Sequence, residues 1–205
     1  MVDYLPTKHK MAVVEEIKRW SRDVLQQPSE FFNGLPACPY AFDAWVNNRV
    51  KITFGGQDQT IKSFDYLDDD RTDLVIVVVS DWDHDEIEPW CDDQNKLLVD
   101  QDLVLMPFVP GSGEGTGQPE EEMVDWEPLV EEEYAMVFIQ RLSDVVAASE
   151  NLEEAGYYKN CTAEFLKYVK DRRERFHNAR QEPLDAEEDV KEDVEERHEQ
   201  VSGND

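Results

Sequence analysis

The chain has 205 residues, with 48 acidic and 20 basic side chains and a formal net charge of −28. This charge excludes nucleic acids and anionic membranes as partners attracted by charge, because both bind basic surfaces. Three cysteines without a Cys-x-x-Cys spacing exclude a zinc ribbon and a disulfide framework.

No apolar run approaches the roughly 18 residues of a membrane span, and the N-terminal residues contain no apolar signal segment. An odd number of cysteines is typical of a reducing compartment, so we predict a soluble, cytoplasmic protein. The charge predicts another protein with a basic surface as the partner, and the alternative is DNA mimicry by carboxylates. The sequence identifies no cofactor.

The first predicted element is a helix from about Lys8 to Leu25. Its apolar residues recur at spacings of three and four, so they share one face, while charged residues occupy the other. These apolar residues are Val13, Ile17, Trp20 and Val24.

The most distinctive stretch runs from Leu35 to Trp45 and contains Cys38 directly before Pro39. Proline is favoured at the first position of a helix, so a short helix is predicted over residues 39–48 with Cys38 at or beside its N-cap. The helix dipole would lower the pKa of this thiol. We therefore predict Cys38 as a catalytic or redox thiol and Tyr40 as a binding residue. The alternative is that Cys38 is a small buried residue among aromatic neighbours.

The Cys-Pro-Tyr-Ala sequence at residues 38–41 resembles the glutaredoxin Cys-Pro-Tyr-Cys site, but it lacks the second cysteine and a preceding strand, so this family is rejected. Residues 10–55 resemble an uncharacterised bacterial family in which a Trp-bearing helix leads to a Leu-Cys-Pro-Phe-Ala motif and then a strand. Trp20 and the run from Leu35 correspond to these features, although two residues separate Leu35 from Cys38 and Tyr40 replaces Phe. The resemblance implies a fold and a helix start, and no reaction, because the family's activity is not established.

Four strands are predicted next. Residues 50–54 and 61–67 alternate apolar and polar side chains around a glycine turn, which predicts a hairpin. Residues 74–79 are uninterrupted apolar residues, which is typical of a central strand covered on both faces. A helix then leads to a fourth strand at residues 103–109, where Pro107 indicates an edge position.

The glycine-rich stretch 111–117 lacks the ending of a phosphate-binding loop and is predicted as a surface loop. Helices are predicted from Tyr134 to Ser149 and over residues 162–180. From Glu182 onward, 11 acidic residues face 2 basic ones, which is typical of a disordered tail. The predicted fold class is α/β (α+β), with one domain over residues 1–180, a small mixed sheet of about four strands flanked by helices, and a disordered acidic C-terminal tail at 181–205.

A second group of candidate binding residues follows the central strand. Ligand sites in open α/β sheets form at the carboxyl ends of strands, so Asp81, Asp83 and His84 are candidates. If the chain is helical from His84, then His84, Glu88 and Cys91 share a face and have the chemistry of iron or zinc ligands. We assign no metal site from this pattern alone.

Three functions are consistent with the sequence. The favoured one is an acidic accessory or binding protein that interacts with another protein, including as a subunit of a larger complex. The alternatives are a thiol-dependent enzyme or redox protein using Cys38, and a metal-dependent enzyme using residues 81–91. Whether the protein is an enzyme stays open.

Overall fold

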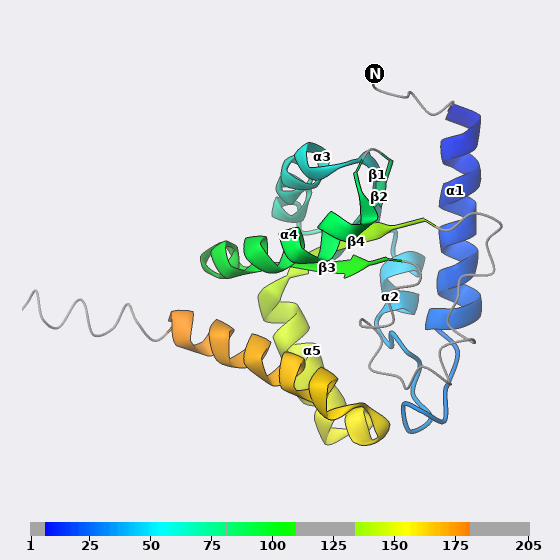
Figure 1. The fold of residues 1–205 in the computed structure, drawn as a ribbon. Coiled ribbons are helices and arrows are strands. Elements are labelled where there is room, and N and C mark those ends of the chain that lie inside the picture. Colours follow the sequence, from blue (N-terminus) through cyan, green and yellow to red (C-terminus); the bar gives the residue numbers. More distant parts are fainter. Residues whose placement is uncertain (1–6, 81, 110–133, 181–205) are drawn as a thin grey trace, which may run out of the picture.

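The computed structural model describes residues 7–80, 82–109 and 134–180, and its architecture is α/β (Figure 1). One mixed sheet contains β1 (Val50–Gly55), β2 (Leu74–Val79), β3 (Leu103–Phe108) and β4 (Met136–Arg141). The helices around it are α1 (Thr7–Trp20), α2 (Ala41–Val46), α3 (Gln57–Lys62), α4 (His84–Leu97), α5 (Leu142–Glu154) and a last helix over residues 163–180. The predicted class, a small mixed sheet of four strands flanked by helices, is confirmed.

Shorter elements complete the description. A π-helix (Ser21–Leu25) extends α1, and 3₁₀ turns lie at Phe64–Asp68, Val99–Gln101 and Tyr157–Asn160. The predicted acidic tail, the predicted loop at 111–117 and the candidate residue Asp81 lie outside the described residues. Within the part of the chain that the structure describes, no helix is long and apolar enough to cross a membrane.

The strands lie in the order β1-β2-β4-β3. β1 and β2 are parallel, whereas β4 is antiparallel to both of its neighbours. β2 and β3 therefore run in the same direction, as a strand–helix–strand unit requires, but β4 lies between them. β3 is at the edge of the sheet, which confirms the position predicted from Pro107.

The central position predicted for residues 74–79 is also confirmed, because β2 is covered on both faces. Val75 and Val77 belong to a core formed with α4, while Ile76 and Val78 contact the buried face of α1 on the opposite side. This two-sided burial explains why the strand is uninterruptedly apolar. The predicted inward face of α1 is confirmed by three buried residues: Val13, Ile17 and Trp20.

The predicted hairpin is wrong in its second arm, where the chain forms α3 and a 3₁₀ turn. Thr60 Oγ1 donates to the Gly56 carbonyl at 3.0 Å and Ser63 Oγ donates to the Gln59 carbonyl at 2.7 Å, which are contacts of a helical backbone. The true partner of β1 is the parallel strand β2. Since parallel neighbours need a crossover connection, a tight hairpin is excluded at this point.

The helix predicted from Tyr134 to Ser149 is wrong in its first half, which forms β4. Met136, Val137 and Ile139 are buried between β2 and β3, and an apolar run of this length fits a central strand as well as a buried helix. The chain becomes helical only at α5.

The free edge of β3 is capped by a side chain of α4. The Asn95 amide nitrogen donates to the Leu105 carbonyl at 2.9 Å, and the Asn95 amide oxygen accepts from the Leu105 backbone nitrogen at 2.8 Å. Asn95 is buried, so it satisfies two backbone groups that would otherwise lack partners. This contact fixes α4 against the face of the sheet opposite α1.

Candidate functional site

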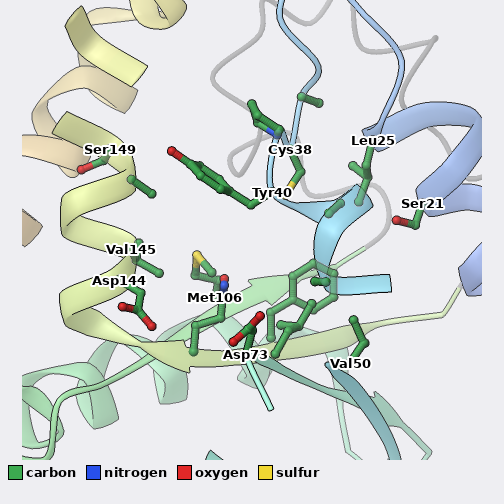
Figure 2. Close-up of a pocket in the computed structure, with 18 of the residues that line it drawn as sticks. Ser21, Leu25, Cys38, Tyr40, Val50, Asp73, Met106, Asp144, Val145 and Ser149 are labelled. Carbon is green, nitrogen blue, oxygen red and sulfur yellow. The ribbon is translucent and has the colours of Figure 1, made fainter. Parts of the chain in front are cut away.

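A cavity of about 550 Å³ lies between the α1-facing side of the sheet and α5, and the segment 37–41 and α2 enclose it further (Figure 2). Its floor consists of side chains from neighbouring strands, because Met106 pairs with Phe138 and Phe138 pairs with Ile76 in the sheet register. Most of the lining is apolar, with a few polar groups. This size and composition are typical of small-molecule pockets.

Cys38 and Tyr40 both line the cavity, so the structure brings together two of the predicted site residues. Figure 2 shows both side chains coming from the segment across the cavity from Met106 and Asp73. Cys38 is half-buried, whereas Tyr40 is 47% exposed and lies at the opening.

The segment that carries Cys38 is held from two sides. The Cys38 backbone nitrogen donates to the Leu25 carbonyl at 2.9 Å, which ties the segment to the end of the π-helix. The Tyr157 hydroxyl donates to the Ala37 carbonyl at 2.5 Å, and the Tyr157 ring stacks on Phe32 with ring centroids 4.3 Å apart. The thiol is therefore positioned by tertiary contacts, one of which joins residues 120 positions apart in the chain.

The helix predicted over residues 39–48 begins two residues later than expected. α2 begins at Ala41 and its N-cap is Tyr40, two residues after Cys38. Burial raises the pKa of the Cys38 thiol, and hydrogen bonds from the backbone nitrogens of Tyr40 and Ala41 offset this only in part. The expected lowering of the pKa is therefore wrong, while a chemical role for the thiol stays a prediction.

The raised pKa predicts slow alkylation of Cys38 at neutral pH. Because the thiolate is the nucleophile, the labelling rate should rise with pH through a midpoint above the free-thiol value of about 8.5. Iodoacetamide labelling followed by mass spectrometry of the Cys38 peptide measures this midpoint. A midpoint near 7 would contradict the prediction and support a nucleophilic thiol.

Two polar residues of the cavity wall are already engaged in structural contacts. Asp73 accepts two hydrogen bonds of 2.5 Å from Arg49. This contact joins the residue before β1 to the residue before β2. Ser21 is buried and accepts from Trp45 Nε1 at 2.7 Å, which joins the end of α1 to α2. These contacts shape the cavity, whose lining also includes the polar side chains of Gln140, Asp144 and Asn151.

Among the cavity residues that sequence reasoning missed is Arg172, because its charge predicts an exposed position. Arg172 lines the cavity and is 8% exposed. A signal for its burial was present in the sequence: residue 172 follows Val169 by three positions and precedes Phe176 by four, which places all three on one helical face.

The candidate residues Asp83 and His84 lie at the start of α4, which covers the opposite face of the sheet from the cavity floor. Asp83 is the N-cap of α4 and accepts from the Asp85 backbone nitrogen at 3.2 Å. His84 is the exposed first residue of this helix. The structure does not bring Asp83 or His84 together with Cys38, and their role as binding residues stays a prediction.

The residues considered as metal ligands differ strongly in environment. α4 does begin at His84, but His84 is exposed while Cys91 is fully buried, and burial raises the pKa of Cys91 to about 12. Over the ranges that the structure describes, no three His, Cys, Asp or Glu side chains are grouped to hold a metal ion.

Comparison with protein-family models, with curated proteins and with solved structures found no match. The resemblance to the uncharacterised bacterial family therefore stays a prediction.

Proposed function

We propose that the protein binds a small, largely apolar molecule in the cavity beside Cys38 and Tyr40. The observation that carries this proposal is the cavity itself, about 550 Å³ in volume and lined mainly by apolar side chains. Natural ligand sites have volumes of roughly 300–1,000 Å³ and combine such linings with a small number of polar groups. The floor of Ile76, Phe138 and Met106 supplies a flat apolar surface for the ligand body.

Ligand binding accounts for the cavity better than thiol catalysis does. A catalytic cysteine needs a thiolate at working pH, whereas burial raises the pKa of Cys38. The thiol and the Tyr40 ring instead contribute polarisable contacts near the opening. The alkylation rate of Cys38 then reports whether the cavity is occupied, because a bound molecule would shield its sulfur from reagents.

The neutral fluorophore N-phenyl-1-naphthylamine tests the proposal. We expect saturable binding with increased fluorescence, and we expect saturating fluorophore to slow the alkylation of Cys38. Cys161, which is half-buried outside the cavity, should react at an unchanged rate and serves as an internal control. Mass spectrometry of the two labelled peptides measures both rates in one sample.

A cavity-filling variant provides the decisive comparison. Ala148 lines the cavity from α5, so Ala148→Trp should abolish fluorophore binding and Cys38 protection. Ala12→Trp, at an exposed position of α1 outside the cavity, should leave both unchanged. If circular dichroism shows that Ala148→Trp does not fold, Ala148→Met is the smaller replacement. Fluorophore binding that survives cavity filling would contradict the proposed function.

The net charge of −28 favours a second function, that of an accessory protein which binds a partner with a basic surface. The same negative charge argues against nucleic acid as a partner, and the free cysteines suit a reducing, cytoplasmic location. Binding through the acidic surface requires no cavity. It would survive Ala148→Trp, so the same variant separates the two functions.

A further inference from the structure

Arg172 is a buried cation with a hydrogen-bond donor that has no acceptor among the described residues. It lies on the apolar face of the last helix, 8% exposed, and it lines the same cavity as Cys38. Burial of a charge is costly unless hydrogen-bonding and charged partners compensate for the lost water.

The partners of Arg172 are few and weak. Its Nη1 is 3.9 Å from the sulfur of Met106, and its guanidinium carbon lies 5.5 Å from the centroid of the Tyr168 ring. Burial lowers the pKa of the Arg172 guanidinium, and the nearby Tyr168 and Tyr158 side chains offset this only in part. The Nε atom is buried and has no hydrogen-bond partner among the described residues. Sulfur is a poor acceptor, so neither Nε nor Nη1 of Arg172 has a strong hydrogen-bond partner.

The neighbouring Arg173, in contrast, has a guanidinium group whose nitrogens have hydrogen-bond and ion-pair partners. Arg173 donates from Nε to the Ser149 hydroxyl at 2.7 Å, donates from Nη2 to the Ser149 carbonyl at 2.5 Å, and forms an ion pair with Glu153. Over the described ranges, no carboxylate lies within ion-pair distance of Arg172, although the chain has 48 acidic residues. Asp73, a carboxylate on the cavity wall, is already held by Arg49.

We propose that the ligand of the cavity is an amphipathic organic acid whose carboxylate binds Arg172 and whose apolar body lies along Met106 and Phe138. This inference rests on the proposed function and names the ligand class of the same site. A carboxylate offers two acceptors in the geometry that a guanidinium fork matches, and the cavity brings it to an unsatisfied cation. The apolar floor beside Arg172 then holds the hydrocarbon part.

A matched ligand pair tests the proposal on the full chain. 1-Naphthaleneacetate and its neutral amide have nearly the same shape, and each can displace N-phenyl-1-naphthylamine from the cavity. We expect the acid to displace the fluorophore at about a tenfold lower concentration than the amide, the effect of one charge-assisted contact. Salt of about 0.15 M limits long-range repulsion by the net charge, because the Debye length is then about 8 Å.

The variants assign the preference to one side chain. Arg172→Met should reduce the acid-to-amide preference to about one. Arg175→Met, at an exposed position of the same helix outside the cavity, removes the same charge and should keep the preference. Arg172→Lys should keep part of it. A preference that survives in Arg172→Met, or equal displacement by both compounds in the native protein, would overturn the proposal.

One measurement needs no variant. At equal concentration, the acid should raise the thermal midpoint of the native protein more than the amide does, because the tighter ligand stabilises the folded state more. An equal shift would also overturn the inference. Absence of fluorophore binding to the native protein would instead contradict the cavity function itself, so the two failures are distinguishable.

Discussion

Replacing Tyr157 with alanine is expected to lower the free energy of unfolding by about 3–5 kcal/mol, the usual cost of removing a buried aromatic side chain. The Tyr157 ring stacks on Phe32 and its hydroxyl donates to the Ala37 carbonyl, directly before Cys38. The variant should therefore also increase the alkylation rate of Cys38. Urea unfolding monitored by circular dichroism and labelling at pH 8.5 measure the two effects.

Two further variants separate the ring from the hydroxyl. Tyr157→Phe keeps the stacking and removes the donor to Ala37, so we expect a loss of about 1–2 kcal/mol. Tyr66→Ala removes a tyrosine that is 39% exposed and should cost less than about 1 kcal/mol. Equal losses for Tyr157→Ala and Tyr66→Ala, or an unchanged labelling rate of Cys38, would show that Tyr157 does not anchor this segment.

Alkaline pH is expected to destabilise the protein strongly, because burial raises the pKa of several acidic groups, including Cys91, Cys38 and Tyr157. Burial raises the pKa of Cys91 to about 12, with smaller contributions from Asp92 and Glu88, whereas an unfolded thiol has a pKa of about 8.5. The unfolded chain therefore loses this proton first as the pH rises. The stabilisation is complete below about pH 8.5 and is lost progressively toward pH 12, at about 1.4 kcal/mol per pH unit for this thiol.

Between pH 8.5 and 10.5, Cys91 alone should reduce the free energy of unfolding by about 2 kcal/mol. Burial also raises the pKa of Cys161, to about 11, and this half-buried thiol adds a smaller loss in the same direction. Urea unfolding at pH 7.5, 9.5 and 10.5 measures the slope. Cys91→Ala should remove the contribution of this thiol, about 1.4 kcal/mol per pH unit, from the slope. A free energy of unfolding that stays constant over this pH range would contradict the assignment.

Several elements could be predicted because their signal is local. The spacing of Val13, Ile17 and Trp20 predicts the buried face of α1, and the continuous run of β2 predicts a strand covered on both sides. Pro107 predicts the edge position of β3. In each case neighbouring residues in the chain carry the whole pattern, since helical and extended periodicities extend over only a few residues.

The candidate site was predictable in part. Cys38 and Tyr40 were recognised from an unusual run, and both line the cavity, but the pKa of Cys38 depends on burial, which no local pattern records. Arg172 was missed because its charge suggested exposure, although its helical spacing indicated the inner face. Asp83 and His84 follow β2 but lie on the far side of the sheet from the cavity.

By itself the sequence determined the acidic character of the chain, its α/β class, and the helices and strands with a strong local period. Only the tertiary structure decided that Met136–Arg141 is a strand and Gln57–Lys62 a helix, because strand pairing joins residues far apart in the chain. The cavity also depends on the tertiary structure, because its lining residues come from positions as far apart in the chain as Ile17 and Arg172. Its volume, the raised pKa of its thiol and the unsatisfied guanidinium exist only once these distant segments are packed together.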